Sequence, residues 1–284
     1  MLGSLSAAAR PLNTLNVVML TSVRSQKVSQ MLTAWRGRDI GNLTVVVEHP
    51  AAEPASSRLR RRLRHEGLSW IGTRLRAANE SAADAAAQMT SATDVLTFCR
   101  SHDIAVLETG PLESASAIAA IKALSPDLGI HAGAGLLRRP LIDAFRLGVL
   151  NAHMGLLPAY RGMNVTEWAA LEGGTVGCTV HLIDTGIDTG PILATREVDI
   201  AGCGSIGALR AAVDRAQLAL LGDIVGLIVG GKLPEPLEAA GPPGQQYFHM
   251  HQDLAAILEG RLLGAQAPHR QGEGDSQRPR LLAG

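Results

Sequence analysis

The sequence predicts an α/β protein: a Rossmann-like, mostly parallel sheet with helices on both faces, followed by a C-terminal β-hairpin and helix. Short apolar runs typical of strands alternate along the chain with stretches of helical periodicity, an order that favours parallel pairing. Hydrophobic residues make up 46% of the 284 residues and charged residues 18%. This composition supports a buried core and excludes general disorder.

The predicted elements of the first half alternate as a parallel sheet requires. Strands are expected at residues 15–21, 43–48, 104–108, 128–132 and 149–153, and helices at 25–35, 114–124 and 140–147. A long insert, at about 50–103, separates the second strand from the third. It carries an Arg-rich run from Arg58 to Arg64, which is either a solvated helix face or a phosphate-binding patch, and an alanine-rich helical stretch at 74–88.

After residue 175 the pattern changes to two adjacent strand-like runs, 177–183 and 192–198. A Gly-containing loop joins them, which predicts a β-hairpin with an extended loop. A long amphipathic helix is expected at 205–229, with Ser205 as its N-cap. The expected organisation is one main domain at 15–230, a short C-terminal segment at 231–263, and disordered ends at 1–14 and 264–284.

Charge and cysteine content exclude several classes of protein. Lys plus Arg and Asp plus Glu number 26 each, so the chain lacks the basic excess of a general nucleic-acid-binding protein. No apolar run approaches the roughly 20 residues that cross a bilayer. Cys99, Cys178 and Cys203 lie far apart without a CxxC pair, which fits neither a disulfide framework nor a zinc site. We expect a cytoplasmic protein with no metal, no membrane association and no nucleic-acid partner.

Asn151 and His153 are the residues that first indicate chemistry. They lie two positions apart at the end of a predicted strand, so their side chains point to the same face. Ligands of open α/β sheets bind outside the carboxyl ends of the strands, where this pair emerges. The turn-forming loop at 155–162 can pass over such a site, and Asp188 lies in a second, Gly-flanked loop that can close its other side.

An amide donor, an imidazole and a carboxylate in one cleft suit acyl transfer to an amine. Attack of an amine on a formyl group creates an oxyanion and a cationic nitrogen together. The amide of Asn151 and a protonated His153 can stabilise the oxyanion, while the imidazole and the carboxylate of Asp188 can move the proton. No Ser or Cys occupies a GxSxG elbow, so the sequence offers no covalent nucleophile of that kind.

The region from residue 149 to 193 resembles the formyltransferase family that uses 10-formyltetrahydrofolate. The resemblance lies in four ordered pieces: Asn151-x-His153, the LLPAYRG loop at 156–162, the GCTVH strand at 177–181, and the DTGP turn at 188–191. One departure is Met154-Gly155, where many members of the family have Pro-Ser. This departure changes the stiffness of the loop more than its chemistry.

The resemblance implies roles for particular residues. Asn151, His153 and Asp188 are implied to be catalytic. The implied cofactor-binding residues are Leu136, Leu137, Arg138, Asp184, Gly186, Ile187 and Asp188, and the implied substrate-binding residues are Tyr160, Arg161, Gly162 and His181. Two alternatives stay open: Leu136 and Leu137 could be core residues, and His181 could be a hydrogen-bonded core histidine.

The acceptor is implied to be a small-molecule amine, and the closest likeness is to amino-sugar N-formyltransferases that act on nucleotide-linked sugars. The segment at 21–27 lacks the glycines that glycinamide ribonucleotide enzymes carry there, and the chain after Ile200 is too short for the basic barrel of methionyl-tRNA enzymes. A formyltetrahydrofolate hydrolase, a methionyl-tRNA formyltransferase and a non-catalytic folate-binding protein remain alternatives, and a homodimer remains open.

Two other motifs are weaker. Residues 202–207 match GxGxxG, but a charged segment precedes them and no convincing strand follows the helix, so a dinucleotide site is not expected. His249 and His251 form an isolated HxH pair, which is little evidence for a metal.

Overall fold

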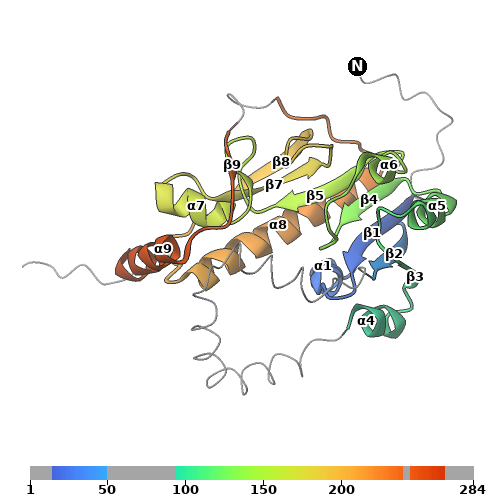
Figure 1. Ribbon diagram of the computed structural model, residues 1–284, viewed down its shortest axis with the longest axis horizontal. Helices are drawn as coiled ribbons and strands as arrows, with labels where there is room; N and C mark the ends of the chain where they lie inside the picture. Colours follow the sequence, from blue (N-terminus) through green and yellow to red (C-terminus); the bar gives the residue numbers. More distant parts are fainter. Residues whose placement is uncertain (1–14, 50–93, 239–243, 266–284) are drawn as a thin grey trace, which may run out of the picture.

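A seven-stranded sheet organises the computed structural model, which describes residues 15–49, 94–238 and 244–265 (Figure 1). Its strand order is β3-β2-β1-β4-β5-β7-β8. The strands are β1 (Asn16–Ser22), β2 (Asn42–Glu48), β3 (Ala105–Thr109), β4 (Leu128–His131), β5 (Val149–His153), β7 (Gly177–Leu182) and β8 (Ile192–Glu197). All of the strands of this sheet lie within two residues of the ranges expected from the sequence.

The first five strands of the chain pair in parallel, and β1 lies between β2 and β4. Residues along β1 alternate between two hydrophobic clusters: Val17 and Met19 belong to one, and Val18 and Leu20 to the other. Because successive side chains of a strand point to opposite faces, both faces of the sheet are buried here. The predicted parallel α/β architecture with helices on both faces is therefore confirmed.

Helices of unequal length cover the two faces. On one face lie α1 (Lys27–Ala34) and α8 (Ile206–Val229), and on the other lie α5 (Ala115–Ala123) and the short α6 (Arg139–Ile142). Figure 1 shows α8 running along the sheet, where it packs against β5, β7 and β8. The hydroxyl of Ser205 accepts a hydrogen bond from the amide of Ala208, so this residue is the predicted N-cap.

The predicted hairpin is also present, since β7 pairs antiparallel with both β5 and β8. A register shift between Val180 and His181 marks a bulge in the β7–β8 ladder. Bulges redirect the chain at the end of a ladder. On the other side of β7 the ladder with β5 is regular, and in it His181 lies directly opposite Asn151.

Several elements were not expected from the sequence. These are α4 (Val95–Ser101) inside the expected insert, α7 (Val165–Glu172), α9 (Gln252–Ala265), and the two-residue strands β6 (Arg161–Gly162) and β9 (Gln246–Tyr247), which pair in parallel. The helix predicted at 140–147 is shorter, because tight i to i−3 bonds at Ala144 and Phe145 end it early. The Arg58–Arg64 run, the 74–88 stretch and the chain ends at 1–14 and 266–284 lie outside the described residues.

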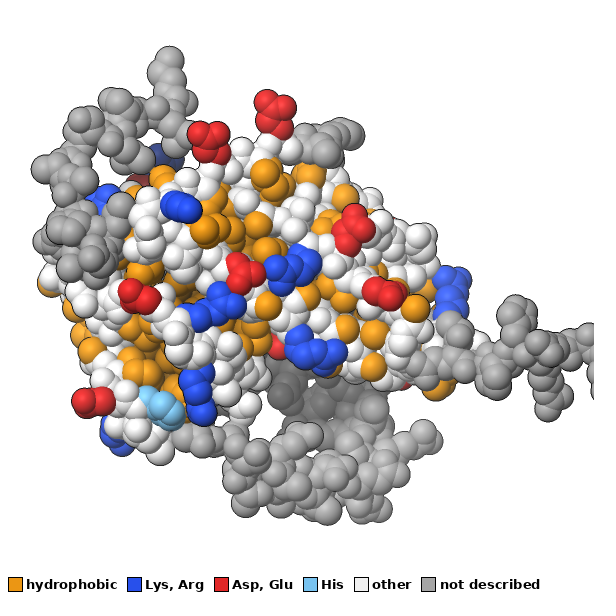
Figure 2. All heavy atoms as spheres, turned by 180° about the vertical axis from the view of Figure 1, so that it is seen from behind, with side chains coloured by type: hydrophobic (Ala, Val, Ile, Leu, Met, Phe, Trp, Pro, Cys, Tyr) orange, Lys and Arg blue, Asp and Glu red, His pale blue; other side chains and the backbone are white. Residues whose placement is uncertain are grey.

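The surface carries charges of both signs. In Figure 2, which shows the molecule from behind, Lys, Arg, Asp and Glu side chains are interspersed over the described atoms. This mixture agrees with the equal numbers of basic and acidic residues in the chain. Of the helices in the described part of the chain, none combines the length and the apolar character that crossing a bilayer requires.

Candidate active site

Strand β5 delivers Asn151 and His153 to the carboxyl edge of the parallel sheet. This strand pairs in parallel with β4 on one side and antiparallel with β7 on the other, so it lies where the direction of the sheet changes. His153 ends the strand and is 7% exposed. Such an edge of an open α/β sheet is where ligands bind.

Asp188 reaches the same point from the loop between β7 and β8. The loop is held by Asp184, whose carboxylate accepts hydrogen bonds from the amide of Gly186 (3.0 Å) and the hydroxyl of Thr189 (2.7 Å). A side chain at Gly190 would lie 1.8 Å from the carbonyl oxygen of Leu182, so only glycine fits there. Asp188 itself has a left-handed φ of 51°, a conformation that Asp and Asn tolerate better than most residues.

The carboxylate of Asp188 lies between two imidazoles. Its Oδ2 is 3.6 Å from Nδ1 of His153, and its Oδ1 is 3.7 Å from Nε2 of His181. The amide of Gly162 donates a hydrogen bond of 2.9 Å to Oδ2. The Asp188 side chain is only 15% exposed, so water screens this cluster weakly. A positive charge that forms on His153 during a reaction would have a compensating carboxylate beside it.

Hydrogen bonds define the tautomer of each histidine. His153 donates from Nε2 to the carbonyl oxygen of Tyr160 (2.8 Å), which leaves Nδ1 facing Asp188. His181 donates from Nδ1 to the carbonyl oxygen of Leu182 (3.0 Å), and its Nε2 accepts from the amide nitrogen of Asn151 (3.1 Å).

His181 is therefore a neutral acceptor in this arrangement. Burial lowers its pKa below the ordinary value, and the neighbouring His153 lowers it further. Since His181 is 2% exposed, it lies behind Asn151 and orients the amide of that residue. His181 was expected among the substrate-binding residues. In the structure it is instead a buried, hydrogen-bonded histidine, as the alternative stated above describes.

The loop at 155–162 is fixed to the sheet by Thr179, which is fully buried. The Thr179 hydroxyl donates to the carbonyl oxygen of Gly155 (2.7 Å) and accepts from the amide of Leu157 (3.0 Å). Two backbone groups of the loop therefore depend on one hydroxyl. The guanidinium of Arg161, another predicted substrate-binding residue, donates to the carbonyl oxygen of Gly244.

We expect Thr179→Val to lower the free energy of unfolding by about 2 kcal/mol, because two buried backbone groups lose their partner while the side-chain volume hardly changes. Thr195→Val on the adjacent strand is the matched control, since Thr195 is exposed, and its effect should stay within about 0.5 kcal/mol. Urea unfolding curves measure both changes. Equal midpoints for the two variants would contradict this account of the loop.

Leu136, Leu137 and Arg138 follow β4 at the same edge of the sheet. The side chain of Leu136 is 73% exposed, whereas Leu137 packs against the cluster that contains Val18. Arg138 is on the surface, where it pairs with Glu113 at 3.1 Å. The structure therefore brings an open apolar side chain to this edge at Leu136, and uses Leu137 as a partly buried core residue.

His131 lies near the site but is not among the residues predicted from the sequence. It ends β4 and donates from Nε2 to the carbonyl oxygen of Gly135 (3.2 Å). Burial lowers its pKa, while the carbonyl groups of Gly135 and Ala134 and the negative charge of Asp188 act in the opposite direction. The available signal was its place at a strand end beside β5, but a single histidine there has no motif spacing to single it out.

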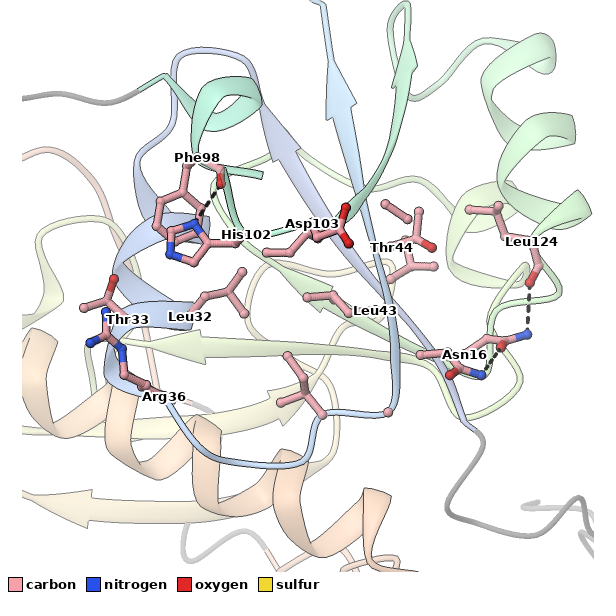
Figure 3. Close-up of a pocket in the computed structure, with 16 residues that line it drawn as sticks. Asn16, Leu32, Thr33, Arg36, Leu43, Thr44, Phe98, His102, Asp103 and Leu124 are labelled. Carbon is pink, nitrogen blue, oxygen red and sulfur yellow. Dashed lines mark hydrogen bonds between the residues drawn. The ribbon is translucent and has the colours of Figure 1, made fainter. Parts of the chain in front are cut away.

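Two cavities of the described part of the chain differ in their distance from this site. One, of about 660 Å³, adjoins the catalytic edge: His153 and Gly162 line it together with Glu167 and Arg210, which form an ion pair. The other, of about 710 Å³, opens at the amino ends of β1, β2 and β3 and includes Phe98 (Figure 3). None of the residues predicted for the site lines this second cavity, so it is remote from the chemistry.

The fold and the site together define a Rossmann-like α/β protein with an Asn–His–Asp group at the carboxyl edge of its sheet. Comparison with known proteins gives the particular family. A family model described as "Formyl transferase" matches residues 15–224, and the chain belongs to this family. Within the described ranges no group of three His, Cys, Asp or Glu side chains is arranged to hold a metal ion.

The names of the relatives and of the similar solved structures refer to several different acceptors. Methionyl-tRNA formyltransferase of Chloroflexus aggregans is 36% identical over 134 residues, which are 46% of this chain and 43% of that protein. The same enzyme of Pelobacter propionicus is 39% identical over 101 residues, 35% of this chain and 32% of that protein. The chain thus spans less than half the length of these curated relatives.

The similarity to solved structures extends over more of the chain than the sequence matches do. A sugar N-formyltransferase from a Shewanella species has a TM-score of 0.55 and 17% identity, and the match covers 88% of both chains. Glycinamide ribonucleotide transformylase 1 of Symbiobacterium toebii has a TM-score of 0.52 and 20% identity, covering 80% of this chain and 95% of that one. At these identities the likeness establishes the fold.

Proposed function

We propose that the protein transfers the formyl group of 10-formyltetrahydrofolate to a primary amine. One observation carries this proposal: the carboxylate of Asp188 lies 3.6 Å from the imidazole of His153, both are shielded from water, and the amide of Asn151 shares their edge of the sheet. Membership of the formyl transferase family supports the choice of group transferred.

The proposed reaction is a direct displacement through a tetrahedral intermediate. The acceptor nitrogen forms a bond to the formyl carbon, and the bond from that carbon to N10 of the cofactor breaks. The acceptor nitrogen loses one proton and N10 gains one, so the reaction consumes no other reactant. The developing negative charge on the formyl oxygen requires hydrogen-bond donors in a site that excludes water.

The residues of this chain would divide these tasks. The amide of Asn151, oriented by His181, and Nδ1 of His153, once that nitrogen is protonated, are the donors for the oxyanion, since Nε2 of His153 is bound to the Tyr160 carbonyl. The carboxylate of Asp188 stabilises the imidazolium and receives the acceptor proton, directly or through a water molecule. A backbone amide, that of Gly162, keeps the carboxylate in place.

The cofactor would lie along the carboxyl edge between two segments. The open side chain of Leu136 offers an apolar surface to a flat pterin ring, and the backbone around Arg138 can hydrogen-bond the edge of that ring. The loop with Asp184, Gly186 and Ile187 would line the opposite side, next to Asp188. These residues suit a planar, hydrogen-bonding ring because apolar and polar groups are combined at one edge.

The acceptor that we propose is a nucleotide-linked amino sugar, with Tyr160, Arg161 and Gly162 at its binding loop. The similarity to a sugar N-formyltransferase over 88% of both chains supports this choice. A second candidate is methionyl-tRNA, which the 36% identity to methionyl-tRNA formyltransferases favours. The three cysteines are free and buried, which supports a reducing compartment such as the cytoplasm.

Release of tetrahydrofolate from 10-formyltetrahydrofolate, followed by absorbance, tests this function. The assay uses a panel of nucleotide-linked amino sugars, charged methionyl-tRNA and a control without amine. We expect release that depends on one amino sugar. Release with methionyl-tRNA alone would show that methionyl-tRNA, and not an amino sugar, is the acceptor. Release without any amine would indicate a hydrolase, and tight folate binding without release would indicate a binding protein.

A further inference from the structure

Tyr247 lies in β9, far along the chain from the site, and contacts the loop that holds both His153 and Asp188. We infer that Tyr247 is a positioning residue for these two groups, acting through Tyr160 and Gly162. The inference rests on the proposed function, since positioning has a consequence for the reaction only where His153 and Asp188 perform it.

The first connection runs through Tyr160. Its carbonyl oxygen accepts the hydrogen bond from Nε2 of His153 at 2.8 Å, and this bond selects the imidazole tautomer. The ring of Tyr160 stacks on the ring of Tyr247, with centroids 5.4 Å apart and an angle of 26° between the planes. Stacking of this kind holds two rings in a defined relative position. A change at Tyr247 therefore moves the acceptor of the His153 bond.

The second connection runs through Gly162, whose amide donates to Oδ2 of Asp188. Gly162 pairs with Tyr247 in the β6–β9 ladder, and the amide of Met163 donates to the carbonyl oxygen of Tyr247 at 3.1 Å. A Cβ atom on Gly162 would lie 2.2 Å from that same carbonyl oxygen, so the two backbones are in close contact. The position of β9 thus determines where the Gly162 amide presents its hydrogen to Asp188.

Tyr247 is itself held firmly. It is 9% exposed, its ring lies 5.5 Å from the ring of Trp168, and its hydroxyl donates to a carboxylate oxygen of Glu172 at 2.9 Å. Burial, together with the hydrogen bond to Glu172, raises the pKa of the Tyr247 hydroxyl, so this group stays a donor. The indole of Trp168 donates to the carbonyl oxygen of Phe248 at 2.9 Å, which fixes the next residue.

Tyr247→Leu tests the inference, because leucine keeps an apolar side chain in the site but cannot stack. We expect kcat to fall about tenfold or more, as small displacements of catalytic groups cause, with KM for the cofactor changing less than about twofold. Tyr247→Phe retains the stack and should recover kcat to within about threefold of the wild type. Unchanged kcat in Tyr247→Leu would overturn the inference.

Two control variants separate positioning from loss of structure. Phe248→Ala changes the neighbouring aromatic residue, which is 69% exposed, and should leave kcat unchanged. Leu258→Ala removes a buried side chain of α9, which is 1% exposed, and should lower the melting temperature while the folded protein keeps its kcat. A proportional fall of kcat with melting temperature across all of the variants would overturn positioning in favour of a structural role.

A spectroscopic measurement gives a result that does not depend on turnover. Nitrogen-15 NMR of the imidazoles reports the tautomer, and His153 should show Nε2–H in the wild type and in Tyr247→Phe. In Tyr247→Leu we expect the nitrogen-15 chemical shifts of His153 to be averaged between the two tautomers. An unchanged His153 spectrum would overturn the inference. If the wild type shows no turnover with any acceptor, the proposed function fails. The spectrum still tests whether Tyr247 positions His153. Tyr160→Leu removes the other ring of the stack and replaces Tyr247→Leu should that variant not fold.

Discussion

His153→Ala should lower kcat for formyl transfer by about 10³-fold, since it removes both a donor to the oxyanion and a proton carrier. The imidazole ends β5 with Nε2 bound to the Tyr160 carbonyl and Nδ1 facing Asp188, so its loss removes the imidazole beside that carboxylate. Binding of the folate should persist, because the proposed folate contacts come from Leu136 and the loop with Asp184. Steady-state kinetics and equilibrium binding of a folate analogue measure the two effects separately.

His102→Ala is the matched control for this variant. His102 follows α4 at the amino edge of the sheet, where it stacks on Phe98 and lines the remote cavity shown in Figure 3. Its replacement should leave kcat at the wild-type value. Turnover that survives in His153→Ala would refute the assignment of His153, whatever the behaviour of the control.

Asp188→Asn is expected to lower kcat by about 10²-fold, the effect of losing an acid–base partner. Asparagine has nearly the same shape and tolerates the left-handed φ of 51° at this position. Its side-chain oxygen can still accept the hydrogen bond from the Gly162 amide. The substitution therefore removes the negative charge beside His153 and little else, so the melting temperature should stay close to that of the wild type.

The comparison with Asp184→Asn decides which carboxylate of the loop takes part in the chemistry. Asp184 accepts its bonds from Gly186 and Thr189, within the loop, so its replacement should change turnover much less than that of Asp188. Full activity in Asp188→Asn together with a large loss in Asp184→Asn would reverse the two roles. The kinetic constants of both variants are measured at the same pH.

The parts of the fold that the sequence predicts well are those with a periodic apolar pattern. The β1 residues from Val17 to Leu20 are all apolar because this strand is buried on both faces, and α8 begins after a Ser205 cap and continues for 24 residues. The helix α7 was missed, since its sequence VTEWAALE contains buried Thr166 and Glu167 and lacks a clear apolar face. Glu167 is buried because it pairs with Arg210 of α8, a tertiary contact without a local signal.

In the candidate site, too, some features can be predicted from the sequence and others cannot. Asn151 and His153 could be predicted as neighbours from their spacing on one strand, and Asp188 from the family resemblance. The pairing of the Tyr160 carbonyl with His153 could not be predicted, because the path of the loop depends on tertiary hydrogen bonds such as that of Thr179 to Gly155. The contact of Tyr247 with this loop joins residues more than 80 positions apart and follows from tertiary packing alone.

Transfer of a carbon-13 formyl group distinguishes formylation of an amine from hydrolysis of the cofactor. The wild type is supplied with 10-formyltetrahydrofolate labelled at the formyl carbon, together with the amino-sugar nucleotide that supports release of tetrahydrofolate. We expect the label to appear on the acceptor nitrogen as a formamide, in amounts equal to the tetrahydrofolate formed. Label recovered as free formate, at a rate that does not depend on the amine, would contradict this expectation.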